Sequence, residues 1–311
     1  MAIGAPAISN DGKQLYAAGT ERHGELSVYD GKSGEFVPYL GGISVCYLDF
    51  SRDGKWIAYV AYPEGTLWRS RIDGRERRQL TSPPLAVMNP RWSPDGKLIA
   101  FVDLSNGDRR QITQGNSDRI YAVSSDGGAP ALLIGGAGIG DPTWSPDGNS
   151  LAYSYHEPGS IVTNTEVRIL DLRTMKSTTV PGSAGMWSPR WSPDGRYLVA
   201  IVGPPAGPTI RMTLFTFAAN TWQELIAGNF GWDCWSRDSR FVYAQETGSV
   251  VRIDVSNRKK EQVASLQGFQ STAYVLDKWN IGWFGLTPDG RPISTRDTGI
   301  SEIYALDLEY K

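Results

Sequence analysis

Charged, amide and aromatic side chains recur just ahead of a short turn that the chain repeats seven times. Carboxylates, guanidinium groups and flat rings that converge on one surface would hold a polar ligand in place. Because these residues differ from copy to copy, the repeated scaffold does not dictate them. The residues form two columns, one four residues and one two residues before the Ser or Thr of each turn. One column is expected to face a shared channel and the other to pack between repeats. The column four residues before the turn Ser or Thr consists of Ala5, Tyr47, Asn89, Asp141, Ser188, Trp232 and Trp283. The column two residues before it consists of Ala7, Asp49, Arg91, Thr143, Arg190, Cys234 and Gly285.

Tryptophan is abundant, with 11 in the chain. Four of these occupy a fixed position of the repeat, whereas others gather near the same turns in the later copies. An aromatic funnel with a few polar anchors would suit a sugar, a peptide or a flat ring. The alternative is that these rings only pack between repeats. The predicted ligand-binding residues are Tyr47, Asn89, Arg91, Asp141, Trp187, Arg190, Trp232, Asp233, Trp279 and Trp283.

Signatures of catalysis or metal binding are sparse. The only histidines are His23 and His156, both in expected loops, and two histidines cannot build a histidine-rich metal site. The glycine-rich stretch Gly135–Gly140 leads into an expected strand rather than a helix, and no Walker loop or nucleophile elbow occurs. We therefore predict a non-catalytic binding or sensor module without metal or cofactor. A glycan-active hydrolase or lyase, built on carboxylates with His156, is the alternative.

The turn has the consensus Trp-Ser-Pro-Asp-Gly-Lys. Proline presets the first turn position, aspartate accepts hydrogen bonds from nearby amides, and glycine adopts the positive φ that other residues resist. A structural role is expected for the turn aspartates, because each lies in a different repeat. They follow one another at intervals of about 42 to 52 residues, which is typical of propeller blades. The seven copies are Ile8–Lys13, Phe50–Lys55, Trp92–Lys97, Trp144–Asn149, Trp191–Arg196, Trp235–Arg240 and Leu286–Arg291.

Short segments of alternating residues divide each repeat into four strands. Their branched and aromatic residues indicate sheets that are packed on both faces. The sequence predicts an all-β propeller of seven four-stranded blades, with six as the alternative, in one domain over residues 1–311. The last repeat ends after its third strand, Glu302–Asp307, so we expect a last blade that is incomplete or closed by the N-terminus, where only Met1–Gly4 precede the first repeat.

The repeats resemble a known family. The stretch Trp92–Phe101 (WSPDGKLIAF) is similar to the TolB-like, WD-repeat-like propeller units of bacteria. Tyr62–Arg71 and Arg296–Glu309 resemble the C-terminal propeller domains of acidobacterial winged-helix regulators or Ser/Thr kinases. This resemblance implies a propeller that senses a ligand or binds a protein, and it brings no catalytic residues.

Charge and composition limit the kinds of partner that the chain is expected to bind. The chain has 31 Lys+Arg against 33 Asp+Glu, and its short basic clusters lie in turns of different repeats, so we predict no nucleic-acid binding. No segment predicts a membrane span or a signal peptide. Cys46 and Cys234 are expected to be free thiols. We expect a monomer that binds a protein or a small molecule. The sequence leaves two compartments open, the cytoplasm, or the periplasm for a part of a larger membrane-anchored protein. The long loops Asp103–Ser117 and Tyr155–Thr165 are further candidates for recognition.

Overall fold

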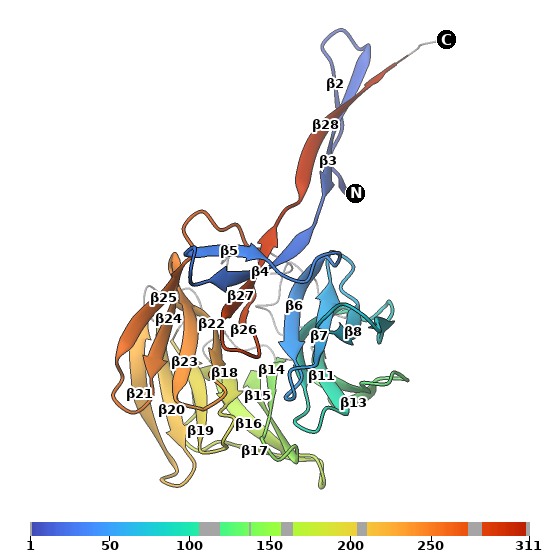
Figure 1. Cartoon of the computed structure of the whole chain (residues 1–311). Coiled ribbons are helices and arrows are strands. Elements are labelled where there is room, and N and C mark those ends of the chain that lie inside the picture. Colours follow the sequence, from blue (N-terminus) through green and yellow to red (C-terminus); the bar gives the residue numbers. More distant parts are fainter. Residues whose placement is uncertain are drawn as a thin grey trace.

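The computed structural model describes residues 2–105, 119–136, 138–156, 164–203, 210–272 and 282–308. These residues form seven four-stranded antiparallel sheets and contain no helix, so none of them forms a helix that could cross a membrane. The predicted all-β propeller fold is thereby confirmed, with as many sheets as there are repeats (Figure 1).

Five sheets each come from one continuous repeat, in which successive strands pair as neighbours. The second repeat forms β6 (Val45–Phe50), β7 (Trp56–Ala61), β8 (Leu67–Arg71) and β9 (Arg78–Gln79). The third forms β10 (Val87–Trp92), β11 (Leu98–Asp103), β12 (Arg119–Ser124) and β13 (Ala131–Ile134). The fourth forms β14 (Ile139–Trp144), β15 (Ser150–His156), β16 (Thr165–Asp171) and β17 (Lys176–Thr179). The fifth forms β18 (Met186–Trp191), β19 (Tyr197–Val202), β20 (Ile210–Thr216) and β21 (Thr221–Gly228). The sixth forms β22 (Phe230–Trp235), β23 (Phe241–Glu246), β24 (Ser249–Asp254) and β25 (Lys260–Ser265).

The first and last repeats share the remaining two sheets. One sheet joins β26 (Phe284–Leu286) and β27 (Pro292–Asp297) of the last repeat to β4 (Gly24–Asp30) and β5 (Glu35–Pro38) of the first. It contacts both the second and the sixth repeat, so six sheets contact one another in a closed cycle, hereafter the ring. The N-terminal part of the chain thus closes the last blade, which was one of the two alternatives expected from the sequence. The closing strands are β4 and β5, whereas Met1–Gly4 are not part of them.

The seventh sheet projects from the ring (Figure 1). It consists of β1 (Ala2–Ile3), β2 (Ala7–Ile8), β3 (Gln14–Glu21) and β28 (Ile300–Asp307), and is called the arm below. Within the arm, β3 pairs with β1 and β2 on one side and with β28 on the other. The N-terminal residues of the chain therefore contribute to the arm rather than to the ring.

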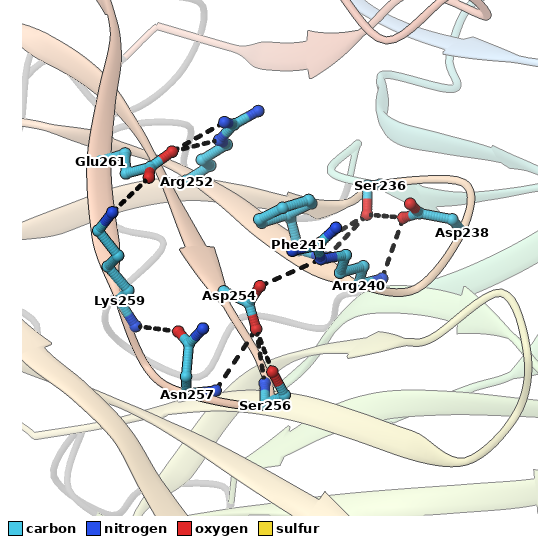
Figure 2. Close-up of polar contacts among 10 residues, drawn as sticks. All are labelled: Ser236, Asp238, Arg240, Phe241, Arg252, Asp254, Ser256, Asn257, Lys259 and Glu261. Carbon is cyan, nitrogen blue, oxygen red and sulfur yellow. Dashed lines mark hydrogen bonds and ion pairs between the residues drawn. The ribbon is translucent and has the colours of Figure 1, made fainter.

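The repeated turns have the predicted structural chemistry, which Figure 2 shows for the sixth repeat. The Ser236 hydroxyl donates to Asp238 Oδ1 over 2.6 Å, and the same carboxylate oxygen accepts from the Arg240 amide over 3.0 Å. Ser239 replaces glycine here and adopts a φ of 58°. Its hydroxyl accepts a hydrogen bond from the Asp194 amide of the neighbouring repeat, which offsets the cost of this conformation. The hydrogen bonds from Ser236 and from the Arg240 amide lower the pKa of the Asp238 carboxyl.

Apolar side chains of the inner three strands of each ring sheet fill the space between neighbouring sheets. Ile57, Ile99 and Leu198 of the second strands are fully buried. Two of the four repeat tryptophans link adjacent sheets: Trp144 Nε1 donates to the Arg91 carbonyl over 3.0 Å, and Trp235 Nε1 donates to the Arg190 carbonyl over 2.9 Å. The ring is therefore a rigid frame for the first strands.

Candidate functional site

The first strand of each ring sheet lies innermost. β6, β10, β14, β18, β22 and β26 contact one another in sequence order around the ring. Side chains from these strands can therefore meet at the axis, although they are roughly 45 residues apart in the chain.

Irregular backbone directs polar side chains from these strands toward one another. Register shifts interrupt the pairing of the first strand in five sheets, for example between Met88 and Arg91 and between Gly140 and Thr143. Asn89 and Asp141 lie in these bulges with φ near 50°, a left-handed conformation that Asn and Asp tolerate better than other side chains. As a result, the Asn89 amide Nδ2 donates to Asp141 Oδ1 over 2.7 Å.

Arg190 joins this pair to a third strand. Its side chain is 6% exposed, and its Nη2 lies 3.6 Å from Asp141 Oδ1. Nε lies 3.9 Å from Asp233 Oδ1 and donates to the Asp233 carbonyl over 3.3 Å, while Nη1 donates to the Pro189 carbonyl over 2.9 Å. These contacts fix the guanidinium group in one orientation. We call Asp49, Asn89, Arg91, Asp141, Arg190 and Asp233 the axial cluster.

Burial perturbs the two other carboxyl groups of the axial cluster. It raises the pKa of Asp233 to about 6, an effect that Arg190 opposes. Neither carboxylate oxygen of Asp233 has a hydrogen-bond partner among the described residues. Burial likewise raises the pKa of Asp49 to about 6, against the opposing effect of Arg91 and of a 2.7 Å hydrogen bond from the Trp92 amide.

The axial cluster couples opposite sides of the ring. Arg190 acts on the pKa of Asp49, although β18 and β6 belong to sheets that are not neighbours. Burial and the Arg190 charge lower the pKa of Arg91. The charges of Arg91 and Arg190 thus act on two buried carboxyl groups, Asp49 and Asp233, which have pKa values of about 6.

The predicted aromatic residues separate into three groups. Tyr47 and Trp232 stand beside the axial cluster: their ring centroids are 5.6 Å apart, and the Arg190 guanidinium lies 6.0 Å from the Trp232 ring. Trp283 is 4% exposed and belongs to the core around the second repeat. Trp187 packs against the core of the fifth and sixth repeats, with Nε1 donating to the Gly203 carbonyl over 3.5 Å. Trp279 lies outside the described residues.

Both sequence columns contribute to the axial cluster, since Asp141 of one column contacts Asn89 of the same column and Arg190 of the other. Asp49 is the member that the predicted site omits. The signal for it was its position, since Asp49 precedes its turn by the same two residues as Arg91 and Arg190. Most of the long loop 103–117 and much of the loop 155–165 lie outside the described residues.

Cys234 lies beside the axial cluster, where burial, Asp233 and Arg91 act on the pKa of its thiol. Within the described ranges, His, Cys, Asp and Glu side chains form no group of three that could hold a metal ion. His23 contacts Thr298 at the base of the arm, and His156 ends β15. Cys46 and Cys234 are free thiols, as predicted, and burial raises the pKa of both.

A depression lies between the second and third repeats, at their turns. It has a volume of about 310 Å³ and is lined by Trp56, Arg69, Trp92, Asp95 and Asp126, among others. Arg69 lies over the Trp56 ring at 4.4 Å and pairs with Asp126 at 3.3 Å, so its charge is already engaged. This depression at the turns is distinct from the predicted site, so a substitution in it is a control for substitutions at the axial cluster.

Comparison with known proteins supports the fold and leaves the activity open. No family model matches the chain. It is 32% identical over 116 residues to an uncharacterised protein of Agrobacterium fabrum, which covers 35% of this chain and 39% of that protein. It is 29% identical over 159 residues to an uncharacterised peptidase of Bacillus subtilis, which covers 41% of this chain and 24% of that protein. The chain thus matches well under half the length of each of these curated relatives.

Solved structures match over nearly the whole chain. A protein of Agrobacterium tumefaciens assigned as TolB superposes with a TM-score of 0.63 at 16% identity, covering 93% of this chain and 100% of that one. An oligogalacturonate lyase in complex with manganese superposes with a TM-score of 0.62 at 12% identity, covering 95% and 96%. At these identities the likeness concerns the fold. The chain has the TolB-like β-propeller fold that its turn repeats predict.

Proposed function

We propose that this chain is a non-catalytic binding or sensor module, which recognises a small molecule, glycan, peptide or protein partner at the axial end of the ring. The axial cluster is the observation that carries the proposal. It presents charges of both signs beside two aromatic rings, and such a mixture gives a ligand both orientation and contact area.

The geometry of the axial cluster favours recognition because its charges are held before a ligand arrives. Asn89 and Arg190 fix the Asp141 carboxylate, and two backbone carbonyls fix Arg190. A ligand that binds such a set loses little free energy to the ordering of side chains. The side chain of Asp141 is still 23% exposed, so a ligand can reach it.

A glycan lyase is the second candidate, for a specific reason. Asp49 and Asp233 have pKa values of about 6, which is the range in which a carboxyl group can both accept and donate a proton near neutral pH. Arg91 and Arg190 beside them could pair with an acidic sugar. The likeness of fold to an oligogalacturonate lyase adds to this candidate.

A thermal-shift screen against neutral and acidic sugars, peptides, nucleotides and divalent metals tests the binding proposal. A ligand that binds only the folded chain raises the unfolding midpoint by mass action. We expect one chemical class to raise it, and the rise to be lost in Trp232→Ala. The matched control is Trp56→Ala, which alters the depression at the turns and should preserve the rise. Loss of the rise in Trp56→Ala alone would move the site to that depression and contradict the proposal.

Incubation with oligogalacturonate, with and without manganese, separates the two candidates. A lyase forms an unsaturated product that absorbs ultraviolet light, whereas a binding module leaves the polymer intact. We expect no product. Product that forms with the natural chain and not with Asp233→Asn would replace the binding proposal with the lyase.

A further inference from the structure

The arm exposes apolar side chains on both faces of its sheet. Ile8, Ile300 and Leu306 are 60%, 54% and 62% exposed, and Ile303 is 77% exposed. Residues paired across strands share a face, so Leu306 lies with Leu15 and Ile8 on one face, and Ile303 lies with Ala18 on the other. In the ring sheets, both faces are covered by neighbouring sheets. A small sheet with uncovered apolar faces is a mark of an interaction site.

A specific junction holds the arm out from the ring. The pairing of β4 with β27 continues into that of β3 with β28 in one register, from Gly24 opposite Asp297 to Glu21 opposite Ile300. The Thr298 amide donates to the His23 carbonyl over 2.9 Å, and His23 Nδ1 lies 2.8 Å from the Thr298 hydroxyl. The two chain segments therefore leave the ring together as one continuous ribbon.

Glycine permits this junction on both segments. A Cβ atom at Gly24 would collide with the Val45 carbonyl oxygen of β6, and one at Gly299 would collide with the Glu21 carbonyl oxygen of β3. Such close approach of two backbones is possible only without a side chain. The projecting arm is thus a built feature of the sequence.

The outer edge of the arm is complementary to itself. Among the described strands, β28 pairs with β3 alone, so its other edge keeps unpaired backbone groups. If two copies of β28 pair antiparallel about Ile303, Ile300 lies opposite the partner's Leu306 and Ser301 opposite the partner's Ala305. In the same register, Glu302 lies opposite the partner's Tyr304. Glu302 already accepts a hydrogen bond from Tyr304 within one strand, over 3.0 Å.

This register places no carboxylate opposite another. β28 carries Glu302 and Asp307, and in the register centred on Ile303 neither meets an acidic residue of the other copy. The isoleucines and the leucine of β28 meet one another across the axis, and cross-strand pairs of this kind stabilise antiparallel sheets. A twofold axis needs such a self-complementary surface.

We propose that a second copy of this chain docks on the outer edge of β28, so that two arms form one continuous antiparallel sheet across a twofold axis at Ile303. This assigns the arm to dimer formation and replaces the monomer expected from the sequence. It is independent of ligand binding at the axial cluster.

Sedimentation of the whole chain over a range of concentrations tests the dimer. We expect dimers to form below about 100 µM. Ile303→Lys places two like charges opposite each other at the axis and should weaken the dimer at least about tenfold. Leu132→Lys is the matched control, because Leu132 is 51% exposed on the outer strand β13 of a ring sheet, and its dimer should equal that of the natural chain. A natural chain that stays monomeric, or equal weakening by both variants, would overturn the proposal.

Disulfide formation tests the register directly. Ile303→Cys puts two thiols directly opposite each other across the axis, within reach of a disulfide, and mild oxidation should give a covalent dimer. In the same register, Ser301→Cys places its two thiols apart from each other. It should therefore give no more covalent dimer than the natural chain, which itself has the free thiols Cys46 and Cys234. Covalent dimers of Ser301→Cys without those of Ile303→Cys would refute the proposed axis.

Discussion

Asp233 shows how single residues of the axial cluster depend on their surroundings. The residue is 2% exposed, and its carboxylate lies 3.9 Å from Arg190 Nε, which is too far for a hydrogen bond. Burial without donors favours the neutral acid, because charge is costly in a region of low polarity. Arg190 compensates only in part, so the carboxyl group titrates near pH 6 instead of 3.8. Burial raises the pKa of Asp49 as well, but there Arg91 and a hydrogen bond from the Trp92 amide oppose it.

This pKa predicts how stability depends on pH. The folded chain binds the Asp233 proton more tightly than the unfolded chain does, so this contribution to stability is present below pH 3.8 and is lost as the pH rises through about 6. The loss amounts to about 3 kcal/mol. Asn cannot ionise, so Asp233→Asn should become more stable relative to the natural chain between pH 4 and pH 7. Urea unfolding at a series of pH values measures this difference.

Asp238→Asn is the control for that series, because its sign is opposite. Hydrogen bonds at the turn lower the pKa of Asp238, so its contribution to stability is present at neutral pH and is lost as the pH falls through the lowered pKa. The Asp238 variant should lose stability relative to the natural chain as the pH rises to about 5, and the difference should then stay constant up to pH 7. Parallel pH profiles for the two variants would show that Asp233 is not a buried, perturbed carboxyl group.

At the scale of elements, the bulged first strands decide where the site residues point. A regular strand alternates its side chains between two faces, and the bulges interrupt this alternation where the site residues lie. The bulges in β10 and β14 add a residue in the left-handed conformation, with φ of 50° at both Asn89 and Asp141. Backbone strain of this kind is common where a strand presents a functional side chain.

Substitution of Asn89 tests the bulge. Asn89→Ala and Asn89→Gly both lose the hydrogen bond to Asp141, but only alanine has a Cβ that disfavours positive φ. The glycine variant should therefore be more stable than the alanine variant, by about 1 kcal/mol in urea unfolding. Met88 is the control on the same strand, where the order should reverse because glycine weakens a regular strand. An alanine variant at 89 that equals or exceeds the glycine variant would count against the bulged geometry.

At the scale of the whole molecule, strand exchange between the first and last repeats closes the ring. In the second to sixth repeats the second strand pairs with the third strand of its own repeat, whereas β4 pairs with β27 and β3 pairs with β28. One exchanged pair completes the last ring sheet, and the other forms the arm. The same exchange thus ties the chain ends to the ring and creates the surface proposed for a second copy.

A disulfide between β4 and β27 tests this closure. Ser27 and Ser294 are opposite each other and fully buried, so cysteines at both positions should form a disulfide that joins residues far apart in sequence. The bond should raise the free energy of unfolding by about 2–4 kcal/mol. The Ser27→Cys single variant and the reduced double variant are the controls. If the double variant resists oxidation in the folded state, then β4 pairs elsewhere and the exchanged closure is wrong.

The sequence by itself determined the turns, the strands and the propeller fold, because these depend on local chemistry. Ser, Pro, Asp and Gly shape each turn within a few residues, and the residues that follow form strands wherever the turn lies in the chain. Only the tertiary structure decided the exchange of β3 and β4 with β28 and β27. Pairing within a repeat and pairing between repeats use similar strands and similar hydrogen bonds, and the close approach of Gly24 to Val45 belongs to the assembled ring. The axial cluster likewise joins residues of five strands through bulges that no local pattern marks, so the sequence could name most of its members but not their contacts.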